Sequence, residues 1–485
     1  MRKKNSNLFF IYPTFFFQDI HHRDLFYSEL PLKALQVSSL LKKLGKISID
    51  FLDLRYEKEL SSLFSKNKIN FLKFKNRLIK VLEYNSVEKF ENIVFFLDSS
   101  YQFFQTKLIS KIFKEEFPKA RIIVCGQHPT AMSSDFIYKR SNFDIVIVGE
   151  PENVMLDLVK CNYLSKAKKN RPAQIIKSSN NFDLNLLPFP DYNTYLNKYS
   201  YKNKFTFTIQ ASIGCPFNCS FCKIMRTELR NFSFSKFIER LEKLLKIVLK
   251  FNYELPKIGF LDQSFNSAIL SNKILKYIIE NSLQENFKFT CQTRIEIVFK
   301  HKEILNLFKK ARMIAGFGFE SANKDLLLEM KKTRNPSNYL IKMKEILEFY
   351  KTINEPYCRI NTLAGFPGEN AQSFQETINF LKKYAFHENI QISPSLFVND
   401  PITPVYNNMS YFEEKYGTKF EKNWWKIPSD PLLNSILPKP SKNYNKKQLI
   451  KDYKDQYIHL LTKFKLSPFE PLINWKNYFN KLEKE

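Results

Sequence analysis

Gly214-Cys-Pro-Phe-Asn-Cys-Ser-Phe-Cys-Lys223 places three of the seven cysteines within eight residues, and this spacing predicts a metal centre. A closed structural zinc site needs four N or S ligands. After Cys222, the next cysteine is Cys291 and the next histidine is His301, both far along the chain. Three thiolates with one open position indicate an iron–sulfur cubane whose fourth iron binds a small molecule. The alternatives are a zinc knuckle completed from afar and a chance cluster.

The stretch resembles the signature CxxxCx(aromatic)C of the radical S-adenosylmethionine (SAM) enzymes, with Phe221 as the aromatic residue. The resemblance implies that Cys215, Cys219 and Cys222 hold a [4Fe–4S] cluster and that the amino and carboxylate groups of SAM chelate the fourth iron. It also implies that one electron from the reduced cluster cleaves SAM to methionine and a 5′-deoxyadenosyl radical.

The chain around this motif alternates apolar runs with amphipathic stretches. About six such units, with the cysteines directly after the first strand, predict an open (β/α)6 barrel over 201–405 with its chemistry at the C-terminal mouth. The expected strands are Phe205–Ile209, Lys257–Leu261, Phe287–Gln292, Met313–Phe319, Tyr357–Leu363 and Ile390–Phe397. The expected helices lie near 234–251, 271–281, 323–331, 336–351 and 370–385.

Residues 1–165 show an earlier alternation, with strands expected near 7–12, 47–54, 92–98, 121–125 and 144–148. Alternating strands and helices predict a doubly wound, Rossmann-like parallel sheet, which binds ligands beyond the carboxyl ends of its strands. The Lys- and Asn-rich stretch 166–200 contains two prolines in Leu187-Pro-Phe-Pro-Asp-Tyr192 and is expected to be an extended linker. Residues 406–485 are expected to form a small helical C-terminal extension, with a helix near 446–463.

Glycine is scarce, with ten residues where average usage would give about 34. In such a chain a glycine is expected where a side chain would clash or where φ is positive. Seven of the ten follow or end predicted strands, which favours ligand-binding turns, although strand–helix turns also need glycine: Gly126, Gly149, Gly214, Gly316, Gly318, Gly365 and Gly368.

Further motifs of the barrel resemble those with which radical SAM enzymes hold SAM. Phe260-Leu-Asp262 is similar to the first half of an FxDDxF stretch, with Gln263 in place of the second acid. Cys291-Gln-Thr-Arg294, Gly316-Phe-Gly-Phe-Glu320 and Gly365-Phe-Pro-Gly-Glu369 are similar to three later family motifs. The resemblance implies a SAM site made of Phe221, Asp262, Arg294, Glu320, Gly365 and Gly368.

The first domain resembles the cobalamin-binding domain that precedes the barrel in one large class of radical SAM enzymes. The similar segments are Gly126-Gln-His-Pro-Thr130 and Val148-Gly-Glu-Pro-Glu152. The resemblance implies that cobalamin contacts Gly126, His128, Thr130, Gly149 and Glu150. The DxHxxG signature of proteins that ligate cobalt through histidine is absent, because Asp24 follows Asp19-Ile-His21 at the glycine position.

The resemblance implies a cobalamin-dependent radical SAM enzyme that methylates an unactivated carbon or phosphorus centre of a small molecule and receives electrons from a flavodoxin- or ferredoxin-like donor. One alternative is an anaerobic oxidative cyclase of the tetrapyrrole type. Another is a protein that binds cobalamin or SAM without methyl transfer. An RNA-modifying methylthiotransferase would carry a second cysteine triad near its N-terminus, where this chain has Cys125 and Cys161 alone.

The formal net charge of +28 is dispersed and comes mostly from lysine. Because the chain is also rich in Asn, Ile and Phe, the charge is attributed to a compositional bias, and nucleic acid is not expected as a partner. An odd number of cysteines without a regular framework favours a reducing cytoplasm. No apolar run approaches the length of a membrane span, so none is expected.

Overall fold

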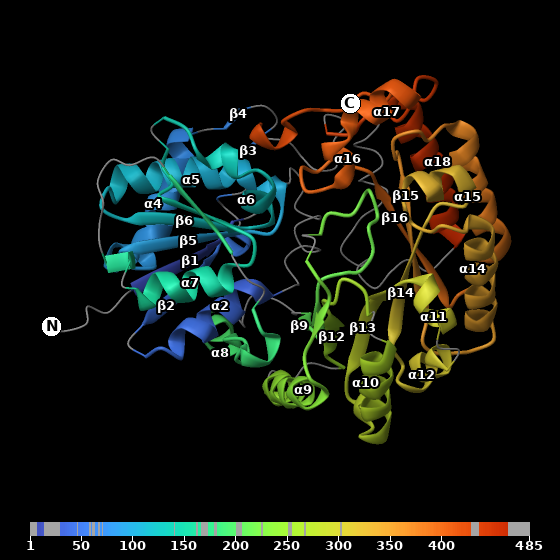
Figure 1. Cartoon of the computed structure of the whole chain (residues 1–485), viewed down its shortest axis with the longest axis horizontal. Helices are drawn as coiled ribbons and strands as arrows, with labels where there is room; N and C mark the ends of the chain where they lie inside the picture. The colour runs from blue at the N-terminus through green and yellow to red at the C-terminus, as the bar shows by residue number, and fades with distance from the viewer. Residues whose placement is uncertain are drawn as a thin grey trace. The chain divides into compact units, whose positions relative to one another are not determined.

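The computed structural model describes residues 7–13, 30–45, 47–57, 60, 64–65, 68–69, 71–139, 141–161, 163–165, 173–178, 182–199, 206–224, 227–250, 255–265, 268–300, 303–427 and 436–463. The chain forms two compact units, coloured along the sequence in Figure 1. The first unit contains Met1–Tyr27, Pro31–Asn203 and Asn423–Pro431. The second contains Ser28–Leu30, Lys204–Lys422 and Leu432–Glu485. Asp19 and His21 lie outside the described residues.

The first unit is built on a six-stranded sheet in the order β2-β1-β5-β6-β7-β8, and all its strand pairs are parallel. The chain reverses its direction of winding between β1 and β5, which is the switch point where such sheets bind ligands. The strands are β1 (Asn7–Tyr12), β2 (Ser48–Asp53), β5 (Asn92–Leu97), β6 (Arg121–Gly126), β7 (Ile145–Val148) and β8 (Gln174–Lys177).

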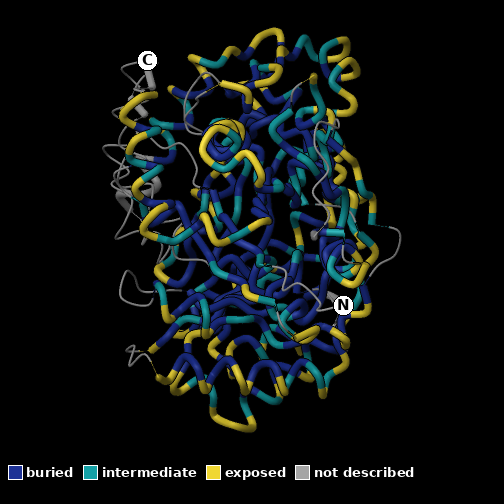
Figure 2. Tube along the Cα trace, turned by 90° about the vertical axis from the view of Figure 1, so that its left-hand side faces the viewer, coloured by how far each residue is buried: buried dark blue, intermediate teal, exposed yellow. Residues whose placement is uncertain are grey.

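Helices cover this sheet, and β5 is buried along its whole length, as in sheets with both faces covered. The helices are α2 (Leu32–Lys42), α4 (Phe71–Tyr84), α5 (Phe103–Glu116), α6 (Gln127–Ala131), α7 (Pro151–Lys160) and α8 (Tyr192–Tyr199). In Figure 2 the buried residues are dark blue and the exposed residues yellow. The predicted doubly wound α/β fold is confirmed.

The stretch 166–200 was expected to be an extended linker, and its described part instead completes the first unit. Strand β8 pairs in parallel with β7 as the sheet edge, where Ile176 lies opposite Ile147. Helix α8 brings the hydroxyl of Tyr195 to 2.5 Å from a carboxylate oxygen of Asp53. An edge strand needs few apolar residues. The Lys- and Asn-rich sequence around β8 therefore did not predict a strand.

The second unit contains a six-stranded parallel sheet in the order β16-β15-β14-β13-β12-β9. The spatial order follows the chain order, which is the winding of a barrel that has not closed, so the predicted (β/α)6 architecture is confirmed. The strands are β9 (Phe207–Ile209), β12 (Lys257–Phe260), β13 (Lys288–Thr293), β14 (Ile314–Glu320), β15 (Cys358–Ala364) and β16 (Ile390–Leu396).

The helices between these strands match the expected ones within three residues at each end. Two short helices, α11 (Ile295–Lys300) and α12 (Ile304–Lys310), follow β13, where no helix was expected. The others are α9 (Phe234–Leu249), α10 (Ala268–Glu280), α13 (Lys324–Glu329), α14 (Pro336–Lys351), α15 (Ala371–Tyr384), α16 (Pro404–Asn407), α17 (Met409–Tyr416) and α18 (Lys446–Lys463). Within the described part of the chain, no helix has the length and apolarity of a membrane span.

The C-terminal extension divides between the two units. Helix α18 packs on α15, and the Tyr457 hydroxyl lies 2.7 Å from the Thr362 hydroxyl in the second unit. Trp424 and Trp425 belong to the first unit and are 2% and 1% exposed. The Trp424 ring centroid lies 4.6 Å from that of Tyr101. We call residues 423–427 the tryptophan strap.

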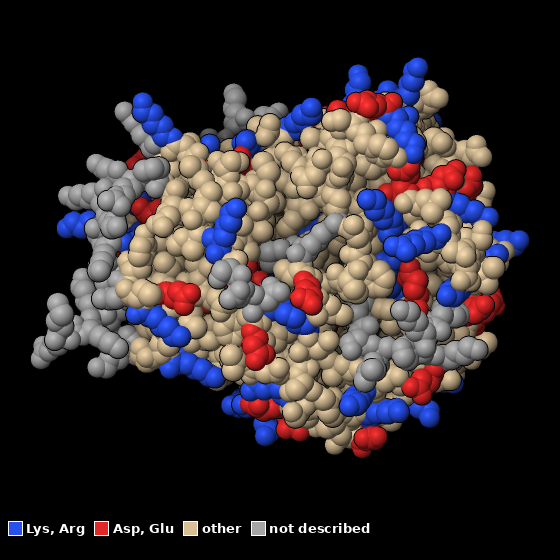
Figure 3. All heavy atoms as spheres, viewed as in Figure 1, with Lys and Arg blue, Asp and Glu red and all other residues tan. Residues whose placement is uncertain are grey.

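The charged side chains are dispersed on the face shown in Figure 3. There, Lys and Arg side chains are scattered with Asp and Glu side chains among them, and most of the visible surface belongs to other residues. This arrangement supports the attribution of the net charge of +28 to composition.

Candidate functional site

The cysteine loop begins at a tight backbone crossing beside the second sheet. Strand β10 (Ser212–Ile213) pairs antiparallel with β11 (Arg230–Asn231), and these two strands bracket the loop. Gly214 has φ of +93°, and a Cβ there would lie 2.2 Å from the carbonyl oxygen of Glu228. A glycine is therefore required where the cysteine motif starts.

Ser220 fixes the middle of the loop, and the sequence analysis did not single it out. Its backbone N–H donates to the Met330 carbonyl at 2.9 Å, and its hydroxyl donates to the Glu329 carbonyl at 2.8 Å. Its own carbonyl accepts from the Val405 N–H at 3.1 Å. Phe221 packs against the hydrophobic cluster that includes Met330 and Val405. The loop is thus held by the two residues that follow Cys219.

The three cysteines line one cavity of about 200 Å³ at the carboxyl ends of the barrel strands. Cys219 is buried, and Cys215 and Cys222 are partly exposed. Among the predicted SAM residues, Phe221, Arg294 and Glu320 also line it. The remaining lining residues are Phe217, Ile224, Gln263, Ser264, Gln292, Thr293, Gly318, Lys332 and Asn361.

Arg294 contacts the cysteine loop directly. Its Nη1 donates to Cys219 Sγ at 2.9 Å, and its guanidinium lies 3.9 Å from the centroid of the Phe217 ring. Its Nη2 donates to Glu296 at 2.9 Å and also to the Lys332 carbonyl. Burial lowers the pKa of Arg294, but attraction to Cys219 and Glu296 outweighs burial and raises it overall. Arg294 therefore places a fixed positive charge against a cysteine sulfur.

Glu320 and Lys332 form a buried ion pair on the cavity wall, 2.9 Å apart. Their side chains are 10% and 4% exposed. Glu320 has φ of +67°, an uncommon backbone conformation for a non-glycine residue that often accompanies function. A Cβ at Gly318 would lie 2.5 Å from Lys332 Nζ, so the ion pair occupies space that this glycine leaves free.

Asp262, Gly365 and Gly368 do not line the cavity. Asp262 accepts hydrogen bonds from the Ala211 N–H at 3.0 Å and the Ser212 hydroxyl at 2.5 Å, which ties β12 to the start of the cysteine loop. Burial raises the pKa of Asp262 to about 6.

Gly365 and Gly368 form the turn after β15. The Gly365 N–H donates to Glu369, whose pKa burial raises to about 8. A Cβ at Gly365 would lie 2.7 Å from Leu449, and one at Gly368 would lie 3.1 Å from Tyr416. In this structure both glycines make room for protein side chains.

The chemistry of the cysteine set fits an iron–sulfur cluster. Three sulfurs share one cavity, and Arg294 and Lys332 bring positive charge to offset thiolate charge. Within the described ranges, no three His, Cys, Asp or Glu side chains already form a metal cage. Burial raises the pKa of the Cys222 thiol to about 11, so metal binding would displace its proton.

The structure brings three of the five predicted cobalamin residues together in the first unit. The Thr130 hydroxyl donates to the Gly126 carbonyl at 2.7 Å and accepts from the Gly149 N–H at 3.0 Å. A Cβ at Gly126 would lie 2.3 Å from the Leu97 carbonyl oxygen. Thr130 therefore joins the carboxyl ends of β6 and β7, and Gly126 allows β6 to pass close to β5.

His128 and Glu150 are both buried, with exposed fractions of 0% and 5%. His128 Nδ1 lies 2.9 Å from the Ser100 hydroxyl, and Nε2 lies 3.5 Å from Asp135. Asp135 also accepts from Trp425 Nε1 at 2.6 Å, within the tryptophan strap. This setting gives His128 a structural role and does not present it to a ligand.

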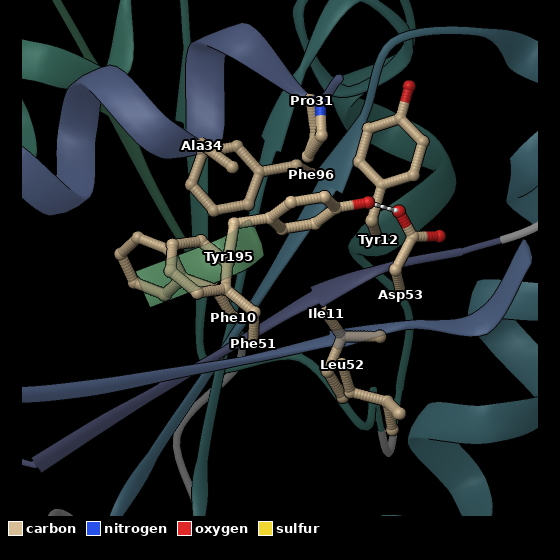
Figure 4. A pocket seen from close by; sticks show the side chains of 10 residues that line it. All are labelled: Phe10, Ile11, Tyr12, Pro31, Ala34, Phe51, Leu52, Asp53, Phe96 and Tyr195. Atoms are coloured by element: carbon tan, nitrogen blue, oxygen red, sulfur yellow. Dashed lines mark hydrogen bonds between the residues drawn. The ribbon is translucent and has the colours of Figure 1, made fainter. Parts of the chain in front are cut away.

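A second cavity in the first unit, drawn in Figure 4, lies between β1, β2 and α2. Half of its lining residues are aromatic, including Phe10, Phe51 and Phe96. The Tyr195 hydroxyl points to Asp53, whose carboxylate also pairs with Arg55 at 2.7 Å. Its volume of about 10 Å³ is sufficient for one water at most, so it is a packing gap.

Comparisons with known proteins agree with this site. Residues 209–381 match the model of the radical SAM superfamily. A tRNA-2-methylthio-N(6)-dimethylallyladenosine synthase of Buchnera aphidicola subsp. Schizaphis graminum is 24% identical over 322 residues, covering 63% of this chain and 67% of the relative. The ribosomal protein uS12 methylthiotransferase RimO of Sulfurimonas denitrificans is 24% identical over 293 residues, covering 56% of this chain and 60% of the relative.

An uncharacterized methyltransferase of Pyrococcus horikoshii is 24% identical over 318 residues, covering 61% of this chain and 65% of the relative. Among solved structures, the cobalamin-dependent SAM radical enzyme OxsB matches 99% of this chain and 70% of its own, with a TM-score of 0.61 and 15% identity. Residues 209–381 are therefore a radical SAM domain, in a chain whose fold resembles that of a cobalamin-dependent radical SAM enzyme.

Proposed function

We propose that this chain cleaves SAM reductively with a [4Fe–4S] cluster held by Cys215, Cys219 and Cys222. The observation that carries the proposal is the single cavity that these three cysteines share with Arg294 and Glu320. When bound, the cluster and SAM supply radical chemistry. The protein would hold the cluster through the loop that Ser220 fixes, and the buried walls of the barrel would exclude water.

Glu320 and Lys332 support the same proposal through their charges. Their buried ion pair fixes the Glu320 carboxylate at the cavity wall. In that position a carboxylate can accept hydrogen bonds from the ribose hydroxyls of SAM. We assign Glu320 this role and Lys332 the role of positioning it.

We further propose cobalamin as the second cofactor and methylation of an unactivated carbon or phosphorus centre of a small molecule as the outcome. The doubly wound first unit, with its switch point between β1 and β5, supports this part, as does the matching fold of a cobalamin-dependent enzyme. The buried imidazole of His128 does not fit a cobalt ligand.

The methylthiotransferases among the relatives suggest a second outcome, transfer of a methylthio group. A second cysteine set would separate the two outcomes, because a methylthiotransferase would carry one near its N-terminus, and the cysteines outside the barrel here are Cys125 and Cys161. Cys125 is buried in β6, and Cys161 is exposed after α7. These two residues do not repeat the triad, so methyl transfer is favoured.

The test is anaerobic reconstitution with iron, sulfide and cobalamin, followed by iron analysis, corrin spectra and a dithionite-dependent assay for 5′-deoxyadenosine. We expect about four irons, a bound corrin and SAM cleavage. Cys219→Ser should lose the cluster, whereas Cys161→Ser, at an exposed cysteine, should keep it. A Cys219→Ser variant that retains its iron would refute the cluster assignment, and iron without corrin would refute the cobalamin assignment.

A further inference from the structure

The barrel contains a hydrogen-bonded pair of amide side chains, which occupies space that a neighbouring glycine leaves free. Gln292 on β13 reaches across β14 to Asn361 on β15, and Asn361 Nδ2 donates to Gln292 Oε1 at 2.8 Å. Gly316 lies opposite Gln292 in the sheet, and a Cβ there would lie 2.5 Å from Gln292 Oε1. The pair can form in this position because residue 316 is glycine.

The hydrogen bond within the pair leaves a donor group on Gln292 and an acceptor group on Asn361 available. With the bond as described, Gln292 Nε2 can still donate and Asn361 Oδ1 can still accept. The reversed orientation of both amides would also leave one N–H and one C=O. Among the side chains that the structure describes, neither amide has a second partner, and both line the cavity of the cysteines. A donor beside an acceptor is the complement of another amide.

The neighbouring wall of the cavity is polar and uncharged. Ser264 and Thr293 are 3% and 4% exposed, and their hydroxyl oxygens have no hydrogen-bond partner among the described residues. The Oε1 atom of Gln263 is also buried without a partner. Buried polar atoms are normally satisfied, so three orphans on one wall point to a ligand that supplies the missing bonds.

The cations on the cavity wall are already paired. Arg294 donates to Glu296 at 2.9 Å, and Lys332 lies 2.9 Å from Glu320. A carboxylate or phosphate would therefore compete with an existing partner, whereas a neutral group would not. The cations that line the cavity are therefore occupied by carboxylates of the protein, whereas the side chains of Gln292 and Asn361 carry no charge.

We propose that Gln292 and Asn361 recognise a neutral amide of the substrate, either a carboxamide or a ring lactam. The inference rests on the proposed function, because it assigns the cysteines and the ion-paired side chains of the cavity to the cluster and SAM. It adds that the substrate enters with an uncharged hydrogen-bonding group next to the reacting position.

The test uses benzamide, benzoate and benzamidine, which share a ring and differ in the head group. Their dissociation constants are measured by ligand-observed NMR on the full chain, loaded with oxidised cluster and saturated with SAM. Benzamide should bind at least about tenfold more tightly than the other two, as expected for a donor–acceptor pair. Equal affinities for benzoate and benzamide would overturn the proposal.

Two variants sharpen the test. Asn361→Asp replaces the amide with a carboxylate, so the preference should change from benzamide to benzamidine. Gln292→Leu should weaken benzamide about tenfold. The matched control is Asn379→Asp, because Gln375 donates to Asn379 at 2.8 Å in an exposed amide pair on α15. A control variant that changes the preference as much as Asn361→Asp would also overturn the proposal.

SAM itself contains a nucleobase, so the titration is repeated without SAM. Unchanged benzamide affinity assigns the amide pair to the substrate, and competition by SAM refutes that assignment. A failure of the proposed function is recognised separately, since it appears as missing iron or missing SAM cleavage. In that event the head-group preference of the unloaded full chain still decides whether the amide pair binds amides.

Discussion

Replacing Arg294 by glutamine should make the reduction potential of the proposed cluster more negative. Arg294 donates to Cys219 Sγ at 2.9 Å, and a hydrogen bond to a charged group contributes roughly 1.5–3 kcal/mol. Reduction adds negative charge to the cluster and its sulfurs, so the arginine stabilises the reduced state more than the oxidised one. For a one-electron couple, about 1.4 kcal/mol corresponds to about 59 mV. Removing the hydrogen bond should therefore make the reduction potential more negative by roughly 60–130 mV.

Glu296 reduces the effect, because it lies 2.9 Å from Arg294 Nη2 and cancels part of its charge. We therefore expect a shift near the lower limit, about 60 mV. The assay is an anaerobic redox titration followed by the EPR signal of the reduced cluster, with iron content measured in parallel. Arg312→Gln is the control, since Arg312 is 48% exposed and pairs with Glu285.

The reasoning would be refuted by an Arg294→Gln variant that keeps its iron and has the wild-type potential within about 20 mV. A less negative potential would refute it equally, because the sign follows from the removal of a positive charge. Loss of SAM affinity at unchanged potential would instead assign Arg294 to SAM, as the sequence motif implies.

Three other substitutions test separate parts of the structure. Gly318→Ala would place a methyl 2.5 Å from Lys332 Nζ, so overpacking should lower the free energy of unfolding by about 1–3 kcal/mol in urea titrations. Burial raises the pKa of Glu369 to about 8, so its protonated form contributes stability that is present below about pH 4.5 and lost as the pH rises through 8. Glu369→Gln should remove this pH dependence of the free energy of unfolding, whose slope is up to ~1.4 kcal/mol per pH unit. An unchanged pH dependence in urea titrations at pH 5, 6.5 and 8 would contradict the assignment. Trp425→Phe removes the 2.6 Å bond to Asp135 and should lower the free energy of unfolding by about 1.5–3 kcal/mol, with no loss of iron.

The sequence predicted those features that are encoded locally. The spacing of Cys215, Cys219 and Cys222 and the alternation of strands and helices depend on neighbouring residues, and the structure contains the corresponding cavity and sheets. The scarcity of glycine correctly singled out Gly316 and Gly318, although their reason differs from the expected one. They leave room for the side chains of Gln292 and Lys332 instead of for a ligand alone.

The features that the sequence did not predict depend on residues far apart in the chain. Gln292 and Asn361 meet across an intervening strand, and no local pattern marks either one. Ser220 is one of many serines until the fold brings three backbone groups to it. His128 follows a recognisable motif, but its burial depends on Trp425, almost 300 residues later.

The tryptophan strap also affects how the chain can fold as it is made. Apart from residues 423–431, the first unit lies before residue 204, yet two of its large buried side chains, Trp424 and Trp425, are synthesised only after most of the barrel. At the usual rate of translation, ~220 residues take about 10–45 s. During that interval Tyr101 and Asp135 of the ribosome-bound chain lack their contacts with Trp424 and Trp425. A fragment cut after residue 203 would remain permanently in this unfinished state, so the first unit should be produced with residues 423–431 supplied as a linked segment.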